Sequence, residues 1–262
     1  MAADVFDPGE RGGLLDGLEP SPGAFCAALH GVLIHDHFGA ICYPAVPPDF
    51  ATASRETLPA AARLARIDEY GEGFQPRPPE RRTVGTCRDF AVMFCAMARR
   101  HGMEAQVRCG FADYLDPPGF EDHWICEYRA AGGGRWAQAD PQLDAAHIAH
   151  LNIGFDPTDL PDGAFLTGCE AWRAVRRGTA MATDFGHGDA CGAWFLKVNL
   201  LRDLHCLLGQ VMSDWDQWRQ VADSAVHDAV PDALCDRLAE AGTGGASSAV
   251  DLPAPPIGGA AM

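Results

Sequence analysis

One stretch decides the fold, TVGTCRDFAVMFCAMARRHG at residues 83–102. Thr86 and Asp89 have the spacing of a capping box, in which a threonine and an acidic residue three positions later close the start of a helix. Apolar residues follow at helical spacing, and Gly102 is typical of a helix end. The stretch therefore predicts a helix of about four turns that begins at Cys87.

Cys87 occupies the first position of this predicted helix. A thiol at a helix N-terminus lies beside unsatisfied amides and the positive end of the helix dipole, which lower its pKa and favour the thiolate. The alternative is a small buried hydrophobic residue, because free cysteine is among the most buried residue types. Position alone leaves both interpretations open.

Three strand-like runs follow the helix, at residues 105–111, 123–128 and 135–140. A glycine-rich connection joins the last two runs and predicts a β-hairpin. A turn centred between Ala131 and Gly132 would place His123 directly opposite Asp140, with Cβ atoms roughly 4.5–5.5 Å apart on one face of the sheet. A slip of one residue would put the two side chains on opposite faces.

The chain thus offers a nucleophile, a base and an orienting carboxylate. We expect the Cys87 thiolate to attack a carbonyl, His123 to carry the proton to the leaving group, and Asp140 to fix the histidine tautomer. The backbone N–H of Cys87 is a natural donor to the oxyanion. This chemistry requires no metal and no cofactor.

Three motifs resemble those of the transglutaminase-like superfamily, in the order Cys, His, Asp: Gly85-Thr-Cys87-Arg-Asp-Phe90, Glu121-Asp-His123-Trp124 and Trp136-Ala-Gln-Ala-Asp140-Pro141. The wider likeness, to compact bacterial members, runs from His35 to the predicted helix at 194–208. The resemblance implies an α+β fold with a papain-like cysteine-protease core. In that core the nucleophile helix packs on an antiparallel sheet, here with helical additions at both ends.

The resemblance also implies a reaction class. The superfamily includes transamidases, peptidases, amidases and amide-forming enzymes of natural-product pathways, and some members without the triad act as binding modules. We expect acyl transfer through a thioester intermediate, from a small-molecule, peptide or carrier-bound amide, ester or thioester to an amine or to water. The alternatives are hydrolysis only, or a non-catalytic interaction module on the same fold.

Further residues are candidates for the site. The resemblance implies that His35, His37 and Tyr43 lie near the active-site mouth as substrate-binding or oxyanion groups. Gln138 shares the predicted face of His123 and could shape the site. Trp124 would point to the opposite face and pack in the core.

Two histidine pairs are candidate metal ligands, His35 with His37 and His147 with His150. Neither pair has a convincing third ligand nearby. The acidic residues at 156–162 do not have the spacing of an EF-hand loop, so no calcium requirement is carried over from the animal transglutaminases. We therefore expect no metal site.

Composition limits the partners. The 262 residues include 20 basic and 36 acidic side chains, for a net charge of −16, which disfavours nucleic acids and anionic membranes. No apolar signal core or membrane span is evident. Ten cysteines without a Cys-x-x-Cys pair suggest reduced thiols in a cytoplasmic protein, and packing explains all of them except Cys87. The oligomeric state stays open.

The ends of the chain differ in composition from its middle. Residues 1–20 are rich in Gly, Asp and Pro, and 241–262 are rich in Gly, Ala and Pro, so both segments are predicted to be disordered. A single domain is predicted over 21–240, with its core at 83–141. Helical spacing outside that core occurs at residues 22–34, 55–70, 194–211, 215–221 and 232–241.

Overall fold

The computed structural model describes residues 4–47, 59–211 and 230–242, and the chain divides into two compact units. Unit 1 comprises Met1–Val107 and Trp124–Pro161, and unit 2 comprises Arg108–His123 and Asp162–Met262. The chain passes between the units three times, within β3 (Glu104–Ala112), within β4 (Phe120–Arg129) and after Pro161. This division differs from the single domain predicted over 21–240.

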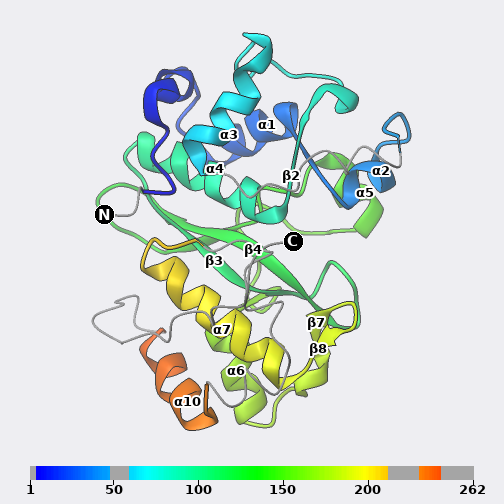
Figure 1. The fold of residues 1–262 in the computed structure, drawn as a ribbon, viewed down its shortest axis with the longest axis vertical. Coiled ribbons are helices and arrows are strands. Elements are labelled where there is room, and N and C mark those ends of the chain that lie inside the picture. The colour runs from blue at the N-terminus through cyan, green and yellow to red at the C-terminus, as the bar shows by residue number, and fades with distance from the viewer. Residues whose placement is uncertain (1–3, 48–58, 212–229, 243–262) are drawn as a thin grey trace, which may run out of the picture. The chain divides into compact units, whose positions relative to one another are not determined.

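Unit 1 is mainly helical. In chain order its elements are η1 (Gly9–Leu15), α1 (Pro22–Val32), β1 (Leu33–His35), α2 (Phe38–Cys42), α3 (Ala60–Ile67), η3 (Asp68–Tyr70), η4 (Pro79–Arg81), β2 (Thr83–Gly85), α4 (Cys87–Arg100), β5 (Ala137–Ala139) and α5 (Ala145–Leu151), where η denotes a 3-10 helix. Helix α4 packs against both α1 and α3 (Figure 1). Phe25 of α1 meets Phe94 of α4 edge to face at 5.8 Å, and both rings are fully buried. Eleven of the helix's residues are buried, so α4 is the central element of this unit.

Helix α1 ends earlier than its sequence pattern predicts. Ser21 accepts a hydrogen bond from the amide of Ala24 at 3.3 Å, and proline occupies the first turn, so the start follows the usual N-cap chemistry. At Leu33 the backbone becomes extended, and Leu33–His35 pairs in parallel with Thr83–Gly85. The apolar run fits a helix or a buried strand, and this distant pairing decides between them.

The N-terminal segment corrects the prediction of disorder over 1–20, because residues 9–15 form η1. Leu15 is fully buried and Phe6 is almost so. The amide of Ala60 donates to the carbonyl of Val5 at 2.8 Å, which ties the segment to the start of α3. A few apolar anchors therefore outweigh a composition rich in glycine, aspartate and proline.

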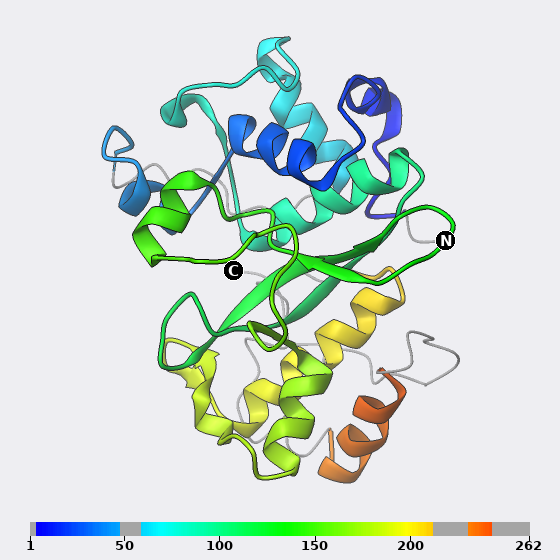
Figure 2. The ribbon, with the colours of Figure 1, turned by 180° about the vertical axis from the view of Figure 1, so that it is seen from behind.

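Unit 2 contains the other ends of β3 and β4 and the C-terminal elements. These are β6 (Phe165–Thr167), α6 (Gly168–Arg176), η5 (Ala182–Asp184), β7 (Phe185–His187), β8 (Ala190–Cys191), α7 (Ala193–Leu207) and α10 (Asp232–Ala241). Helices α6, α7 and α10 pack against one another, as both ribbon views show (Figure 2). Their shared core includes Phe111, Trp172, Phe195 and Leu238.

Helix α7 forms where the spacing at 194–211 predicts a helix, and most of its length is buried. Twelve of its residues are buried, and five of those are polar or charged. Asp203 receives two hydrogen bonds from Arg108, at 2.7 and 2.8 Å, and Lys197 forms an ion pair with Asp232 at 2.8 Å. The polar face of α7 therefore meets partner side chains of unit 2 instead of water.

The six-stranded sheet is mainly antiparallel. Strand β4 pairs with β5, β3 with β6, and β7 with β8 in this way, whereas β4 and β7 are parallel. Strands β1 and β2 form a separate parallel sheet. The predicted α+β class is confirmed. Two predicted segments lie outside the described residues. They are the helix at 215–221 and, from residue 243 onward, the tail predicted over 241–262.

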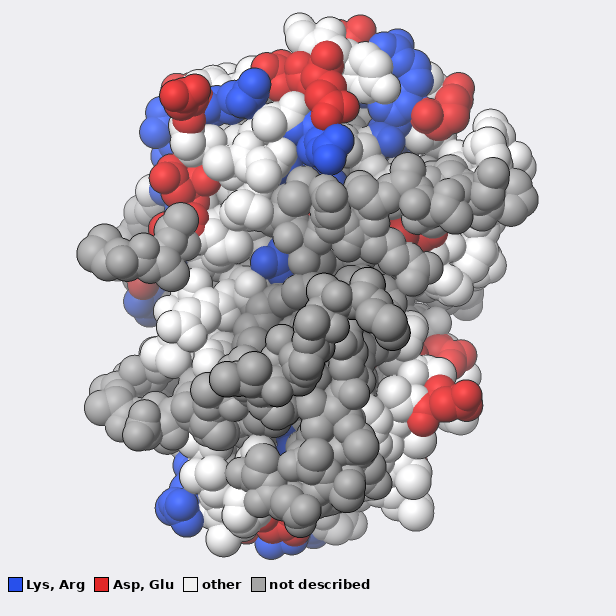
Figure 3. Space-filling view, viewed as in Figure 1, with Lys and Arg blue, Asp and Glu red and all other residues white. Residues whose placement is uncertain are grey.

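Positive and negative side chains are interleaved on the visible face of unit 1 (Figure 3). Surface ion pairs of unit 1 include Arg66 with Glu69 and Arg81 with Glu72. Across residues 4–47, 59–211 and 230–242, no helix combines the length and the apolar character needed to cross a bilayer.

Candidate active site

Cys87 is the first residue of α4 and is partly exposed. Thr86 precedes it as the N-cap in an extended conformation, and the Asp89 carboxylate accepts the Thr86 amide at 2.9 Å. The predicted capping box and helix start are therefore both present. The thiol lies at the positive end of a 14-residue helix, where a thiolate is stabilised.

A buried ion pair lies beside this helix start. Arg63 of α3 approaches Asp89 Oδ1 at 2.8 Å and donates to the carbonyl of Val84 at 2.8 Å. Arg63 and Asp89 are 2% and 1% exposed. Arg63 thus links α3 to β2 through the Val84 carbonyl and to α4 through Asp89, on either side of Cys87 in the chain.

His35 reaches the same place through strand pairing. Its partner in β2 is Gly85, two residues before Cys87, and the amide of Asp36 donates to the Gly85 carbonyl at 2.9 Å. The Nδ1 atom of His35 accepts the amides of His37 and Phe38 at 3.1 and 3.4 Å. The segment predicted to line the active-site mouth thus begins beside the nucleophile helix, and its His37 is exposed.

Tyr43 belongs to a polar cluster of unit 1, formed with Arg82, Asp144 and His147. Its hydroxyl donates to the Asp144 carboxylate, and Arg82 donates to that hydroxyl at 3.2 Å and stacks on the ring. Asp144 caps α5 by accepting the amides of Ala146 and His147, and it also lies 2.8 Å from Nδ1 of His147.

The cluster shifts the pKa of two of its members. Burial raises the pKa of Tyr43 to about 12, and the hydrogen bond to Asp144 adds to this rise. Burial also acts to raise the pKa of Asp144, but its hydrogen bonds with His147 and Tyr43 outweigh burial, so the pKa lies below its usual value. Asp144 is therefore a carboxylate and Tyr43 a neutral phenol at neutral pH.

Asp140 follows β5 directly and is fully buried. Its Oδ1 accepts the amide of Gln142 at 3.0 Å, and its own amide donates to the carbonyl of Pro157 at 2.8 Å. The next carbonyl, of Pro141, receives a hydrogen bond from His30 Nε2 of α1 at 2.9 Å. The backbone on both sides of Asp140 is therefore fixed.

The β4–β5 register corrects the predicted pairing of His123 with Asp140. Cys126 lies opposite Ala139, and this register continued by one residue puts Asp140 opposite Ile125. Ile125 and His123 project from the same face of β4, because side chains alternate along a strand. The two-residue shift therefore changes the partner of Asp140 but not the strand face that it meets.

His123 is 1% exposed and lies on β4 within unit 2. The ring of Tyr114 packs edge to face against it at 6.2 Å. The preceding residue, Asp122, accepts a hydrogen bond from Asn199 of α7 at 2.9 Å and has Arg202 at 3.8 Å. Helix α7 thus anchors β4 next to the candidate base.

Gln138 is placed away from His123. It lies opposite Glu127, and its amide donates to that carboxylate at 3.3 Å. Glu127 is four residues from His123 along the strand, roughly 13 Å. The Gln138 side chain therefore lies toward the turn of the β4–β5 hairpin, away from His123. Trp124 is 1% exposed, which agrees with the core position predicted for it.

Most other cysteines are buried thiols. Burial raises the pKa of Cys26 and Cys235 to about 12, and that of Cys42, which is partly exposed, to about 11. Cys95 and Cys126 lie in the core of unit 1 with their sulfurs 3.6 Å apart. Packing accounts for these thiols, as the sequence predicts.

The histidine pairs do not gather further ligands. Within the described part of the chain, no three side chains of His, Cys, Asp or Glu converge as a metal site would require. His147 instead pairs with Asp144, and Nδ1 of His35 faces backbone amides.

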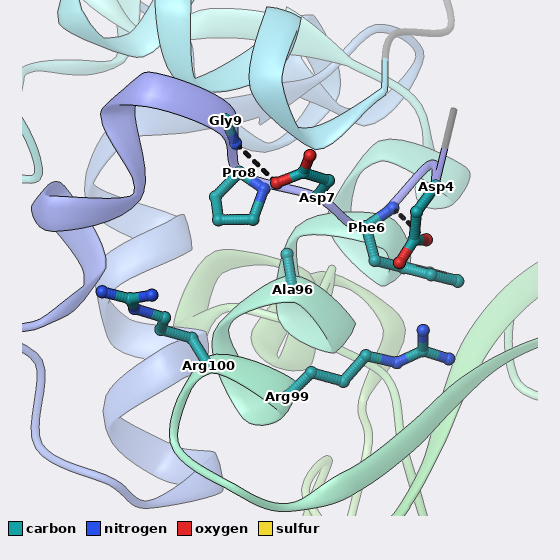
Figure 4. Close-up of a pocket in the computed structure, with 8 residues that line it drawn as sticks. All are labelled: Asp4, Phe6, Asp7, Pro8, Gly9, Ala96, Arg99 and Arg100. Carbon is teal, nitrogen blue, oxygen red and sulfur yellow. Dashed lines mark hydrogen bonds between the residues drawn. The ribbon is translucent and has the colours of Figure 1, made fainter.

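One hollow of about 400 Å³ lies in unit 1 beside Ala96, Arg99 and Arg100 of α4 and the segment from Asp4 to Gly9 (Figure 4). Its two arginines already have partners, since Arg99 stacks on Phe6 within the lining and Arg100 pairs with Asp16. Ala96 follows Cys87 by nine residues, roughly 13 Å along the helix. This hollow is separate from the candidate active site.

Sequence reasoning missed Arg63 and the partners of Tyr43. Arg63 shares the buried face of α3 with Ala60, Leu64 and Ile67, and a charge within an apolar stripe was a detectable signal. Asp144 has the position of an N-cap before a short helical run, which was a second signal. Their partners lie too far away along the chain to be read from local patterns.

Comparison with known proteins agrees with the motifs. Residues 72–141 match the family model of the transglutaminase-like superfamily, a range that includes Cys87, His123 and Asp140. No curated protein and no solved structure matches the chain. The superfamily indicates cysteine-based acyl transfer or hydrolysis as the reaction class. Residues 72–141 are therefore similar to the core of a transglutaminase-like domain.

Proposed function

We propose that this protein is an acyl-transfer enzyme whose catalytic triad is Cys87, His123 and Asp140. The observation that carries the proposal is the place of Cys87, a partly exposed thiol at the first position of a capped helix. Most of the other thiols are buried. The family match, which spans all three residues in the order Cys, His, Asp, supports the assignment.

The reaction proceeds in two halves. The Cys87 thiolate attacks the acyl carbonyl and forms a carbon–sulfur bond, while the Cys87 amide donates to the oxyanion. The leaving group takes a proton from His123 as its bond to carbon breaks, which leaves a thioester. An amine or water then attacks the thioester, His123 accepts its proton, and the Cys87 thiolate leaves.

Features of each residue's own surroundings support these roles. Tyr114 packs on His123, and the hydrogen bonds of Asp122 hold the strand at the neighbouring position. Asp140 is fully buried, accepts one backbone amide and is an acceptor suited to the other imidazole nitrogen. A buried carboxylate in this role fixes the histidine tautomer and stabilises imidazolium.

His35 is proposed as a second donor to the acyl oxygen. Its Nδ1 accepts two backbone amides, so the proton of the neutral ring is on Nε2, which can donate. The Oδ1 atom of Asp36 lies 3.2 Å from Nδ1, and this contact is not a hydrogen bond in that tautomer. His37 is exposed and is proposed to contact substrate, whereas Tyr43 is engaged with Asp144 and shapes the site by packing.

The acyl acceptor distinguishes the members of this reaction class. With an amine the enzyme is a transamidase or amide synthase, and with water it is a peptidase or amidase. The thioester on Cys87 is common to both, so it is the species to detect. A small-molecule, peptide or carrier-bound acyl donor would form it.

Intact-mass spectrometry tests the proposal directly. The wild-type protein is incubated with a panel of amides, esters and carrier-bound thioesters, and the expected result is the mass of one acyl group on Cys87. Cys87→Ala should lose the adduct and remain folded. Cys42→Ala is the matched control, because Cys42 is also partly exposed, and it should retain the adduct. An adduct or turnover that persists in Cys87→Ala overturns the triad.

Selective alkylation separates the enzyme from a non-catalytic interaction module. We expect iodoacetamide to modify Cys87 near neutral pH faster than it modifies the same thiol in denatured protein. Cys42 provides an internal reference, since burial raises its pKa to about 11. Equal rates for native and denatured Cys87 would favour the interaction module.

A further inference from the structure

A buried arginine faces the start of the nucleophile helix. Arg63 of α3 lies 2.8 Å from Asp89 Oδ1 and also donates to the Val84 carbonyl at 2.8 Å. Its side chain is 3% exposed and that of Asp89 is 1% exposed. The Arg63 guanidinium and the Asp89 carboxylate are thus both held out of water, and Asp89 lies in the first turn of α4 with Cys87.

Asp89 uses its other oxygen for the backbone that leads into Cys87. Its Oδ2 accepts the Thr86 amide at 2.9 Å and the Thr86 hydroxyl at 3.4 Å. Gly85 leaves room for this carboxylate, because a Cβ atom there would lie 3.2 Å from Oδ2. Arg63, through Asp89 and Val84, therefore holds both the strand before Cys87 and the N-cap.

The negative charge of Asp89 acts to raise the pKa of a nearby thiol and so makes it less reactive. A carboxylate near a thiol disfavours the thiolate, and low solvent exposure strengthens the effect. A cation paired with that carboxylate removes most of the repulsion. Arg63 supplies such a cation from a different helix, on the buried side of Asp89.

We propose that Arg63 is a positioning residue for the Cys87 nucleophile: it holds Asp89 on the Thr86 amide and neutralises the carboxylate beside the thiol. The inference rests on the proposed role of Cys87. Arg63 is buried, and in this proposal it acts through Asp89 and the backbone and not by touching substrate.

Other charged or titratable groups lie on the elements that meet near Cys87. Arg88 and Asp89 share its helix, His35 belongs to β1, Asp36 follows β1, and Arg63 comes from α3. In the proposed triad, His123 and Asp140 add their own charges. The test therefore changes Arg63 and Asp89 singly and together and leaves the other groups in place.

The pH dependence of Cys87 alkylation by iodoacetamide, followed by peptide mass spectrometry, is the measurement. Arg63→Met should raise the midpoint by about one pH unit and slow alkylation at pH 7 about tenfold, because Asp89 is then unpaired. Asp89→Asn should lower the midpoint, because Arg63 then acts alone. The double variant should return toward the wild-type midpoint. Arg66→Met, on the same helix in an exposed pair with Glu69, is the control and should leave the midpoint unchanged.

A purely structural role predicts a different pattern. Both single variants would lose stability and would leave the midpoint unchanged or shift it in one direction, which overturns the proposal. If Arg63→Met does not fold, Asp89→Asn alone decides, since a midpoint that is not lowered also overturns it. A wild-type midpoint equal to that of an ordinary thiol refutes the proposed function itself. A low wild-type midpoint that Arg63→Met leaves in place refutes only the inference about Arg63.

Discussion

The two compact units place their buried charges differently. In unit 1, Arg63 with Asp89 and His147 with Asp144 lie at the starts of α4 and α5. In unit 2, the ion pairs lie along α7, where Arg108 meets Asp203 and Lys197 meets Asp232. Taking a charge out of water is costly, so each pair needs a compensating gain. The gain along α7 is the fixed position of a helix, whereas at the start of α4 we propose that it is the position and charge of the Cys87 thiol.

The largest effect is expected in unit 2. Asp203→Ala should lower the free energy of unfolding by about 3–5 kcal/mol, because it leaves the buried Arg108 guanidinium without its bidentate partner. Urea unfolding measures the loss. The midpoint of Cys87 alkylation should not change in this variant, in contrast to Arg63→Met.

Two further variants check the origin of that loss. Arg108→Met combined with Asp203→Leu should recover most of the stability, because it removes both charges and fills their volume. Arg176→Ala breaks the exposed pair with Asp236 and should have no measurable effect. A small loss in Asp203→Ala, or a changed Cys87 midpoint, would remove the distinction between the two units.

An intermediate effect is expected at Asp144 of unit 1. Asp144→Asn keeps an N-cap side chain but removes the charge, and it should lower the free energy of unfolding at pH 7 by about 1–3 kcal/mol. The pKa of Asp144 is lowered in the folded state, where hydrogen bonds with His147 and Tyr43 outweigh the opposing effect of burial. Its contribution is therefore present above the ordinary carboxyl pKa and is lost as the pH falls through about 4 and below.

Urea unfolding of both proteins from pH 7 to pH 3 measures this dependence. The difference between wild type and Asp144→Asn should shrink as the pH falls. A difference that stays constant over the whole range would mean that the charge of Asp144 contributes nothing, and that unit 1 uses this residue only as a cap.

The helix of the candidate site could be predicted because its signals are local. Thr86, Cys87 and Asp89 lie within four consecutive positions, and the capping box depends on nothing outside them. The strand runs were recognisable for the same reason, since alternation is visible along each one. The pairing of distant segments leaves no such local pattern, which is why the helix predicted over 22–34 includes Leu33 and Ile34 of β1.

The hairpin register shows how a local signal can mislead. The amide of Gly133 bonds to the carbonyl of Ala130, so a tight turn does form around the predicted centre. Residues 132–134 all have positive φ, which only glycine adopts easily. Pairing with β4 therefore begins only at Ala137 of β5, opposite Tyr128. The loop is therefore asymmetric, and a symmetric turn was the wrong assumption.

The smallest effect is expected at His30, a partly exposed histidine of unit 1 that pairs with a backbone carbonyl and not with a carboxylate. Its Nε2–H donates to the Pro141 carbonyl next to Asp140, and burial lowers the pKa of the ring despite the opposing effect of Asp144. The unfolded chain therefore binds a proton near pH 6.5 that the folded chain does not, and stability falls as the pH drops through that value. His30→Gln should reduce the loss between pH 7.5 and 5.5, by up to about 1 kcal/mol in urea unfolding. His101→Gln is the matched control, because His101 is also partly exposed and makes the same kind of bond to the Leu15 carbonyl. If the two variants respond alike to pH, burial at His30 is not what sets its charge, and the contrast between paired and unpaired groups in unit 1 fails.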